Sequence, residues 1–289
     1  MSAAQTAIVI PMHNALRQLP RCLDSLGWAH DEAVVIVVVD AGSTDGGTEW
    51  IATHFPEVVI VDGDAGMWWT EATEVGCRFA VGELKVEQVG LLNVDCAWNQ
   101  RGFVAARAAL ERYPGVIVCS HVQDRDGGAT TFAGGVTRRS GVLTLRGAGA
   151  PGGTAPSAWV AWCGGQGVLF DSRVFVDTGG FDYRAFPHYF GDSDFCFRAA
   201  YHGTRVWYCS DSTVTDDKIT TGISAHQNGG SLLVIWQSLS SRRSVFNLRD
   251  NVRFYARHAR WRAPIVLLNL YLLWAAWSAR GFIRGRLGV

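Results

Sequence analysis

The chain has 289 residues, and 48% of them are hydrophobic, so it can bury a large core within one domain or one domain with an appendage. Its formal net charge is zero, which argues against nucleic acid as a partner. Its seven cysteines never form a C-x-x-C pair, which indicates reduced cytoplasmic thiols rather than a disulfide framework or a zinc site. No basic stretch precedes the first apolar run, so no export signal is expected.

The first 120 residues alternate between apolar runs and segments with helical periodicity. The apolar runs predict buried strands at residues 6–11, 33–39, 58–61, 89–94 and 116–120. Apolar residues at helical spacing predict helices at residues 16–26, from about 48, at 70–81 and at 102–112. Such an alternation indicates an α/β fold with a mostly parallel, Rossmann-like central sheet flanked by helices.

The later part of the chain is less regular. We expect a hairpin around residues 138–141, an apolar segment at 158–170, a helix at 195–201 and a short strand at 205–209. Residues 211–230 are polar and contain glycine, which predicts a loop. The chain therefore divides into an α/β domain at residues 1–215, a mobile loop or linker beside the site at 216–241, and a helical extension at 242–289.

The C-terminal extension is basic, because from residue 242 onward it has ten arginines and one acid, Asp250. Apolar and basic residues fall on neighbouring faces of a helix at about 245–260, which is typical of helices that lie on an anionic membrane surface. Residues 263–279 then form a 17-residue run without a charge. Since a transmembrane helix needs roughly 17–25 residues, three outcomes stay open for this run. It lies in or dips into the membrane interface, packs against the body or a second subunit, or spans the bilayer.

Polar side chains follow two of the expected buried strands. Asp40 opens a glycine-rich turn at residues 40–47, and Asn93 and Asp95 follow the strand at 89–94. Ligands bind at the carboxyl edge of open α/β sheets, and we expect these two strand ends to be neighbours there. Residues two apart on an extended segment point the same way, so Asn93 and Asp95 are expected to face one site. The alternative for Asp40 is a plain strand-to-helix turn with a capping side chain.

A third segment, residues 188–198, places the carboxylates of Asp192 and Asp194 among aromatic residues. Apolar surroundings raise the proton affinity of a carboxylate, and such a carboxylate can act as a general base on a hydroxyl. The alternative is the start of a helix, with Asp192 as its cap and Asp194 paired with Arg198 at i,i+4.

These segments, taken in chain order, resemble the motifs of the inverting glycosyltransferases of family 2, which have the GT-A fold. Within that family the chain looks most like the rhamnosyltransferase-type enzymes of bacterial polysaccharide assembly. The matching segments are residues 8–14, 39–46, 66–76, 91–95, 162–165, 179–182 and 190–198. The first two resemble the opening strand with its P-x-x-N and the D-x-G-S-x-D-G donor turn. The next two resemble the entry to the following helix and the metal-binding D-x-D in its L-N-x-D form. Residues 162–165 and 179–182 resemble the acceptor side with its G-G-F-D, and residues 190–198 resemble the motif of the catalytic carboxylate. The resemblance covers residues 7–215.

The resemblance implies roles for individual residues, with Asp192 as the catalytic base. It implies contacts with a nucleoside-diphosphate sugar from Pro11, Asn14, Asp40, Gly42, Ser43, Trp69, Asn93 and Asp95. It implies acceptor contacts from Trp162, Gly164, Gly165 and Asp194. It also implies a Mg²⁺ or Mn²⁺ ion held by Asp95 and by one later ligand among Asp216, Asp217 and His226.

The resemblance further implies a glycan or lipid-linked glycan as acceptor, with deoxythymidine-diphosphate rhamnose as the first donor to consider. Such an acceptor would be met at the inner face of the cell membrane. We therefore expect a cytoplasmic protein with peripheral membrane contact through residues 242–289, and a homodimer is an option because the C-terminus is apolar.

The chain also departs from the family's pattern. Glu71 and Glu74 stand where a small residue and an Asn are usual, and Asn93 takes the first position of the D-x-D. A catalytically silent nucleotide-sugar-binding or scaffold protein therefore stays an alternative. A nucleotidyltransferase is another, although residues 12–16 lack the glycine-rich basic loop that such enzymes have. Stacking on sugar rings and core packing are both open for Trp68, Trp69, Trp159 and Trp162.

Overall fold

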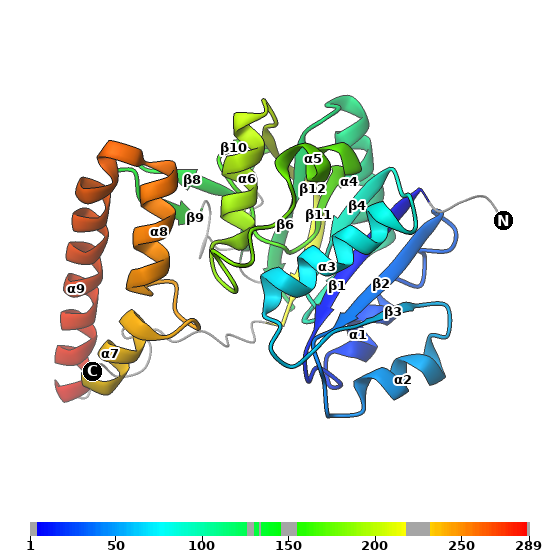
Figure 1. Cartoon of the computed structure of the whole chain (residues 1–289), viewed down its shortest axis with the longest axis horizontal. Coiled ribbons are helices and arrows are strands. Elements are labelled where there is room, and N and C mark those ends of the chain that lie inside the picture. Colours follow the sequence, from blue (N-terminus) through cyan, green and yellow to red (C-terminus); the bar gives the residue numbers. More distant parts are fainter. Residues whose placement is uncertain (1–4, 126–129, 133, 146–154, 218–231, 288–289) are drawn as a thin grey trace.

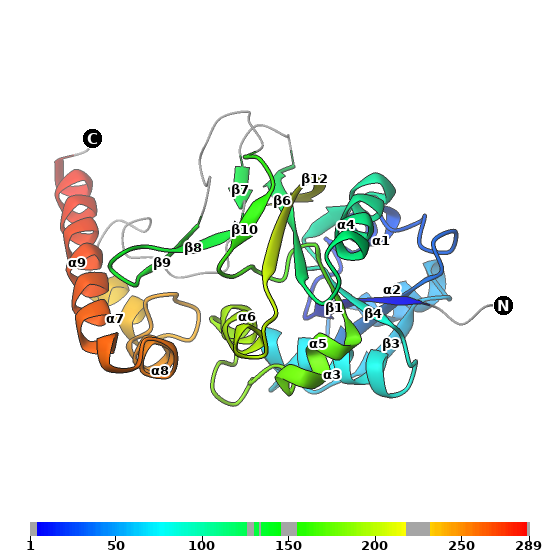
Figure 2. The same cartoon turned by 90° about the horizontal axis from the view of Figure 1, so that it is seen from above.

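The computed structural model describes residues 5–125, 130–132, 134–145, 155–217 and 232–287. The described residues form an α/β body and a group of helices from the C-terminal part of the chain, which lies beside the body (Figure 1). Figure 2 shows the same arrangement from above and makes the layers of the body visible.

A ten-stranded sheet forms the centre of the body in the described part of the chain. Its strands are β1 (Thr6–Met12), β2 (Val34–Asp40), β3 (Val59–Asp62), β4 (Gln88–Leu91), β5 (Cys96–Trp98), β6 (Ile117–Asp124), β7 (Thr130–Phe132), β10 (Ala158–Val160), β11 (Val168–Asp171) and β12 (Val206–Asp216). The main order is β10-β12-β6-β11-β4-β1-β2-β3, while β5 pairs with β12 and β7 with β6. A separate hairpin consists of β8 (Gly135–Thr137) and β9 (Leu143–Leu145).

The central strands are mostly parallel, as the sequence predicts. β4, β1, β2 and β3 run parallel to one another, and β12 runs parallel to β6. β11 lies antiparallel between β4 and β6. All seven residues of β1 are buried, because a parallel strand covered by helices on both faces meets no solvent.

Helices cover both faces of this sheet. They are α1 (Leu19–Asp24), α2 (Gly47–His54), α3 (Trp69–Gly82), α4 (Gln100–Arg112), α5 (Ser172–Thr178) and α6 (Gly191–Tyr201). α3 contacts β1, β2 and β4 on one face, and α4 contacts β6, β11 and β12 on the other (Figure 2). Gly76 permits the close approach of α3, because a Cβ there would lie 2.4 Å from Cγ1 of Val9.

The C-terminal helices pack against the body through a second apolar cluster. They are α7 (Leu232–Ser240), α8 (Leu248–His258), the 3₁₀ turn η1 (Arg260–Arg262) and α9 (Ala263–Leu287). The cluster joins Val142 between β8 and β9 and Phe186 before α6 with Phe254 of α8 and Val266 of α9. The hairpin β8–β9 reaches from the body to α8 and α9 (Figure 2). None of the helices in the described ranges combines the length and apolar character needed to cross a bilayer.

Two strands differ from the sequence-based expectation. The strand expected at residues 89–94 ends at Leu91, so Asn93 and Asp95 lie in a turn rather than on extended chain. The strand expected at 205–209 continues as β12 to Asp216, because pairing with β6 and β5 stabilises its polar second half.

The segment expected as a loop or linker at residues 216–241 contains a helix. Residues 232–240 form α7, whose sequence is largely apolar. Residues 218–231, which include His226, lie outside the described residues.

Candidate active site

A cavity of about 450 Å³ lies at the carboxyl ends of β1 and β4, the edge at which open α/β sheets bind ligands. It is lined by Pro11, Met12, His13, Asn14, Ala15, Gln18, Ala41, Met67, Trp68, Trp69, Ala72, Asn93, Val94, Asp95, His188 and Arg243. Five of the residues expected to contact a donor are therefore in its wall, whereas Asp40, Gly42 and Ser43 are not. We call this cavity the donor cavity, after the ligand that the sequence predicts for its residues.

Asp40 organises the turn beside the donor cavity. Its Oδ1 accepts a hydrogen bond from the Ser43 N–H at 3.0 Å, and its Oδ2 accepts one from the Thr48 hydroxyl at 3.1 Å. Ser43 Oγ in turn accepts from the Asn14 N–H at 2.9 Å, and Asn14 Oδ1 accepts from the Thr44 N–H at 2.8 Å. Both oxygens of Asp40 are thus used within the turn, which holds Asn14 in the cavity wall. A contact between Asp40 and the donor base stays a prediction.

The turn requires glycine at residue 42. Gly42 has a φ of +71°, and a Cβ there would lie 2.5 Å from the backbone nitrogen of Ala65.

The strand ends that carry Asp40 and Asn93 are not neighbours, contrary to the expectation, because β1 lies between β2 and β4. A one-dimensional sequence does not contain the strand order that separates them.

Trp69, the first residue of α3, fixes the position of Asn93. Its indole N–H donates a hydrogen bond to Asn93 Oδ1 at 2.9 Å. The Trp69 ring also packs directly on Gly165, where a Cβ would lie 2.2 Å from the ring carbon Cζ2. Trp69 therefore joins a residue expected at the donor to one expected at the acceptor.

Two carboxylates converge near the donor cavity. Asp95 follows Asn93, and the pairing of β5 with β12 brings Asp216 close to it. Burial and then the neighbouring Asp216 carboxylate raise the pKa of Asp95 above its usual value. Because Mg²⁺ and Mn²⁺ prefer carboxylate oxygens, this donor set fits the divalent cation that the sequence predicts.

The other candidate metal ligands are placed differently. Asp217 Oδ1 lies 2.9 Å from Nη1 of Arg21, so this carboxylate already forms an ion pair. His226 lies outside the described residues. Among the residues that the structure describes, no group of three or more His, Cys, Asp or Glu side chains is arranged to hold a metal ion.

Asp192, the second residue of α6, is partly buried and directed at Gly164. Its Oδ1 accepts hydrogen bonds from the N–H and the hydroxyl of Ser193, at 2.7 and 3.3 Å. Its Oδ2 accepts none from any residue that the structure describes, and a Cβ on Gly164 would lie 3.5 Å from it. Burial raises the pKa of Asp192 to about 6, against the opposing effect of the Ser193 hydrogen bonds. Asp192 thus has a free oxygen and the proton affinity of a base that works near neutral pH.

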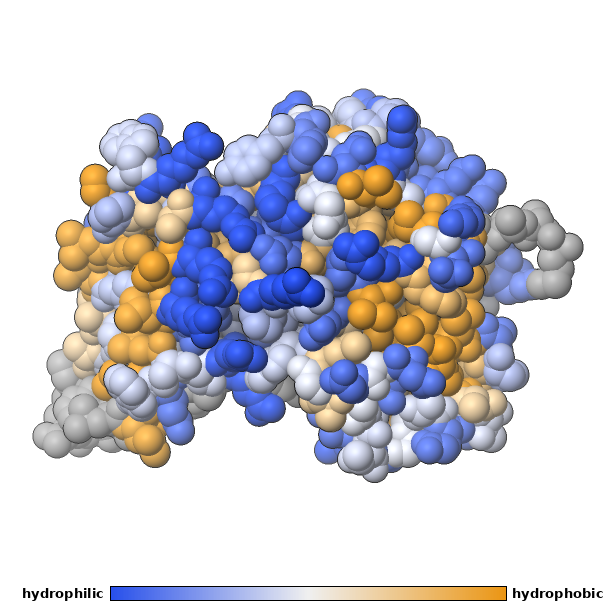
Figure 3. Space-filling model, in the orientation of Figure 1, coloured by the Kyte–Doolittle hydropathy of each residue, from blue (hydrophilic) through white to orange (hydrophobic). Residues whose placement is uncertain are grey.

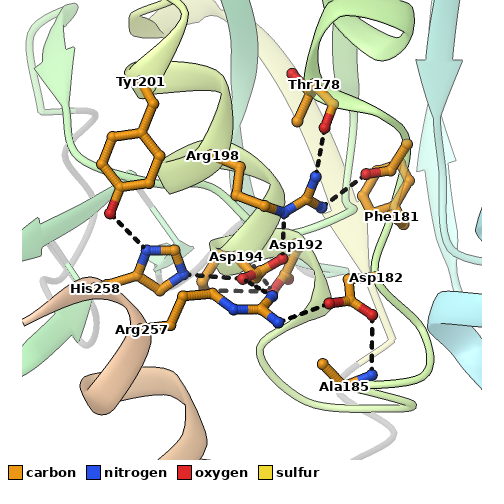
Figure 4. Close-up of polar contacts among 12 residues, drawn as sticks. Thr178, Phe181, Asp182, Ala185, Asp192, Asp194, Arg198, Tyr201, Arg257 and His258 are labelled. Atoms are coloured by element: carbon orange, nitrogen blue, oxygen red, sulfur yellow. Dashed lines mark hydrogen bonds and ion pairs between the residues drawn. The ribbon is translucent and has the colours of Figure 1, made fainter. Parts of the chain in front are cut away.

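Asp194 has a different environment from Asp192, although the two are only two residues apart (Figure 4). Its side chain is fully buried, and its Oδ2 accepts a hydrogen bond from Arg198 Nε at 2.7 Å, which confirms the expected i,i+4 pair. Its Oδ1 accepts from Arg257 Nη1 at 2.8 Å and from His258 Nε2 at 2.9 Å, both on α8. Burial acts to raise the pKa of Asp194, but the hydrogen bonds and charges of these partners hold it below its usual value.

The acceptor contact expected of Asp194 does not fit this position, because the carboxylate meets no solvent and both its oxygens are occupied. Arg257 also donates to Asp182 Oδ2 at 2.8 Å. Asp194 therefore anchors α8, which belongs to the C-terminal extension, to the helix that carries Asp192.

Glu74, one of the two glutamates that depart from the family's pattern, is buried on α3. Its Oε2 accepts a hydrogen bond from the Phe181 N–H at 2.5 Å, and Oε1 pairs with Arg78. Gly180, with a φ of +77°, leaves the space that this carboxylate fills. The glutamate thus ties α3 to the segment before α6 and has a structural role.

The four tryptophans divide into two pairs. Trp68 and Trp69 line the donor cavity, and stacking on a ligand stays a prediction for both. Trp159 packs against Tyr113 and Trp207 at the sheet edge. Trp162, expected at the acceptor, packs on the aromatic ring of Phe132. Trp162 thus packs against the core of the body, whereas Trp159 is 38% exposed and packs on neighbouring aromatic rings at the sheet edge.

Among the residues of the donor cavity that sequence reasoning missed are His188 and Arg243. His188 Nδ1 is buried without a hydrogen-bond partner in the described part of the chain, and burial, with the nearby Arg243, lowers the pKa of His188 to about 4. Arg243 belongs to the extension whose arginines we assigned to a membrane surface. The sequence shows the pair Arg242-Arg243, but the charge of an arginine does not reveal whether its side chain faces a membrane or a ligand cavity.

Comparison with known proteins agrees with this geometry. The model of the family described as "Glycosyl transferase family 2" matches residues 7–157, just over half of the chain. No curated protein matches the chain. Among solved structures, GalNAc-T7 with UDP, GalNAc and Mn²⁺ is similar at 13% identity and a TM-score of 0.58, with 85% of this chain and 50% of that chain covered.

Two further structures are similar in the same way. TarS from S. aureus shows 14% identity and a TM-score of 0.56, with 86% of this chain and 42% of that chain covered. The mannosyltransferase PcManGT from Pyrobaculum calidifontis, in complex with GDP-Man and Mn²⁺, shows 18% identity and a TM-score of 0.55, with 98% of this chain and 86% of that chain covered. The chain spans half or less of the first two proteins, and at these identities the likeness concerns the fold, which is GT-A-like. The sheet, the motifs and the matching family model together show that this chain belongs to glycosyl transferase family 2.

Proposed function

We propose that the protein is an inverting glycosyltransferase, which moves a sugar from a nucleoside-diphosphate sugar to a hydroxyl of a glycan or lipid-linked glycan. The observation that carries this proposal is the environment of Asp192, which has a pKa of about 6 and one oxygen that accepts no hydrogen bond from the residues that the structure describes. Asp192 adjoins Gly164, the next residue Gly165 supports Trp69, and Trp69 lines the donor cavity. A base is thus connected to a ligand cavity through two contacts, that of Asp192 with Gly164 and that of Gly165 with Trp69.

In the proposed reaction the donor occupies the donor cavity, with its ring systems against Trp68 and Trp69. Asp192 Oδ2 takes the proton of the acceptor hydroxyl. The hydroxyl oxygen forms a bond to the anomeric carbon as the bond from that carbon to the diphosphate breaks, and the configuration is inverted. Only one protein base is needed, because the diphosphate leaves as an anion.

Asp95 and Asp216 would hold the divalent cation, whose chemistry is to offset the charge that grows on the leaving diphosphate. Arg243, in the wall of the same cavity, brings a further positive charge to it. The titles of two similar structures name Mn²⁺ together with UDP or GDP-Man, which supports testing Mn²⁺ first. For the donor we propose deoxythymidine-diphosphate rhamnose, on the resemblance alone.

We also propose that α9 contacts an anionic membrane surface at the inner face of the cell membrane. One face of α9 packs on α8 through Val266 and Leu270. Another face leaves large apolar side chains exposed, and Figure 3 shows hydrophobic residues along this side of the molecule. On α9 these side chains include Ile265 at 59%, Leu268 at 61% and Leu272 at 60%, and Trp261 of the preceding turn η1 is 81% exposed. Exposed Arg260 and Arg262 flank the tryptophan, and this combination is typical of interfacial helices.

Sedimentation with phosphatidylglycerol vesicles tests the membrane proposal. Ile265→Glu should reduce binding at least about tenfold, because it places a charge in the apolar face. Val176→Glu is the control, since Val176 is equally exposed, at 60%, but lies on α5 of the body. Equal binding of both variants, or a concentration-dependent dimer that Ile265→Glu abolishes without any vesicle binding, would contradict the proposal.

Donor turnover tests the proposed reaction. The protein is incubated with uridine-, deoxythymidine- and guanosine-diphosphate sugars, with Mn²⁺ or with a chelator, and released nucleoside diphosphate is measured. Release from one donor that stops on chelation supports the proposal. Nucleotide binding without release from any donor, even with glycan acceptors present, would favour the silent binding protein.

A further inference from the structure

A second cavity, of about 700 Å³, lies between the loop before α6 and the helices α7 and α8. Four arginines line it, Arg184 from the loop and Arg242, Arg249 and Arg253 from the extension, together with a single acid, Asp250. Figure 3 shows strongly hydrophilic residues between the C-terminal helices and the body. We call this cavity the arginine pocket.

The positive charge of the arginine pocket is only partly balanced by the residues that the structure describes, since the single carboxylate of Asp250 faces the charges of Arg253, Arg249 and Arg242. Among the residues that the structure describes, Arg184, Arg242 and Arg249 form no ion pair, and Arg253 donates only to the backbone oxygen of Ala185, at 2.6 Å. The pocket thus carries four guanidinium groups against one carboxylate. Guanidinium groups facing one cavity are suited to phosphate, which they bind by charge-assisted, often bidentate hydrogen bonds.

The wall of the pocket also contains apolar residues. Leu239, Leu248 and Val252 line it, and the last two are 49% and 44% exposed. A ligand that consisted of a soluble anion alone would contact the arginines but would leave the exposed leucine and valine beside them without a partner. A phosphate attached to a hydrocarbon chain satisfies both kinds of surface.

The arginine pocket adjoins the donor cavity. Consecutive residues line the two, Arg242 with Pro187 in the arginine pocket and Arg243 with His188 in the donor cavity. The guanidinium carbon of Arg242 lies 5.9 Å from the ring centre of Trp68, which is in the wall of the donor cavity. A molecule bound in the arginine pocket therefore ends beside the place proposed for the donor sugar.

We propose that the arginine pocket binds the phosphate or diphosphate of an amphiphilic acceptor, a sugar joined through phosphate to a hydrocarbon chain. This inference rests on the proposed function, since it assigns the pocket to the acceptor of that reaction. It gives the arginines at 242–253 a role in substrate recognition in place of general adhesion to a membrane. The apolar chain leaves the pocket past Leu248 and Val252, and the sugar points toward the donor cavity.

Binding of farnesyl diphosphate, measured by calorimetry on the full chain without donor, tests this inference. We expect binding to the wild type and a loss of at least about tenfold in Arg249→Gln, since each charge-assisted hydrogen bond to phosphate contributes to affinity. Farnesol should bind far more weakly than farnesyl diphosphate, and so should inorganic diphosphate. Arg173→Gln is the matched control, because Arg173 is an exposed arginine of α5 outside both cavities, and it should bind as the wild type does.

Three results would overturn the inference: no binding of farnesyl diphosphate, equal affinity of Arg249→Gln and the wild type, or an effect of Arg249→Gln seen only with phosphatidylglycerol vesicles. The last result would assign the pocket to bulk lipid headgroups. Retained melting temperature in Arg249→Gln separates lost binding from lost folding. Because no donor is present, this experiment can succeed even where donor turnover fails, so the two proposals fail separately.

Discussion

Asp194→Asn removes one charge at the junction between the helix that carries Asp192 and the C-terminal helices. In the native protein this carboxylate is fully buried and accepts hydrogen bonds from Arg198, Arg257 and His258 at 2.7 to 2.9 Å. An asparagine of the same size keeps one acceptor oxygen and turns an NH₂ group toward a donor. Breaking a buried ion pair from one side costs about 3–5 kcal/mol, and we expect a loss of free energy of unfolding in this range.

The melting temperature measures this loss. At about 2 °C per kcal/mol for a chain of this size, Asp194→Asn should melt about 6–10 °C below the wild type. Asp182→Asn is the matched control, because Asp182 pairs with the same Arg257 but is far more exposed, with a relative side-chain exposure of 34% against 0%. We expect it to cost at most about 1 kcal/mol.

The stabilisation contributed by Asp194 depends on pH, and the pKa of Asp194 gives the direction of this dependence. The pKa of Asp194 lies below its usual 3.8, so its contribution to stability is fully present above that value and is lost as the pH falls through the native pKa. The melting temperatures of wild type and variant should therefore differ at pH 7 and converge only in strong acid. A variant as stable as the wild type at pH 7 would refute the view that Asp194 holds the two parts together.

Two further predictions concern the site itself. Since burial raises the pKa of Asp192 to about 6, kcat/KM for transfer should fall about tenfold per pH unit below pH 6. If kcat/KM instead began to fall only near pH 4, the base would have the pKa of an exposed carboxylate, which would contradict the assignment of a buried base. Gly165→Ala should lower kcat/KM for transfer at least about tenfold, because the new Cβ would lie 2.2 Å from the Trp69 ring, and small misplacements in a site cost rate. Gly82→Ala, where a Cβ meets nothing within 4 Å, is the control, and equal activity of the two variants would show that the Trp69 ring moves away without loss.

Local patterns predicted much of the body correctly. The apolar runs identified β1 and β2, and the i,i+4 spacing predicted the pair of Asp194 with Arg198. The glycine-rich turn after Asp40 was found, because its residue types are specific for tight backbone geometry. These features depend on residues close together in sequence, which is why the sequence reveals them.

Contacts between distant residues could not be predicted in this way. β11 enters antiparallel between β4 and β6, and nothing in its apolar sequence shows its direction. Arg257 and His258 reach Asp194 from more than 60 residues away, so an acceptor role for that carboxylate was a reasonable but wrong expectation. The basic extension was predicted as one membrane-facing surface, whereas the structure turns several of its arginines toward cavities and toward Asp194.

The central claim is that Asp192 is the base of a sugar transfer. It is tested most directly by comparing Asp192→Asn with the wild type, using the donor that turns over and measuring both product formation and nucleotide binding. We expect product formation to fall about 10²–10⁴-fold, as on loss of a general base, while nucleotide binding is unchanged because Asp192 does not line the donor cavity. Product formation within a few-fold of the wild type would contradict the account, because the base would then have to be another group.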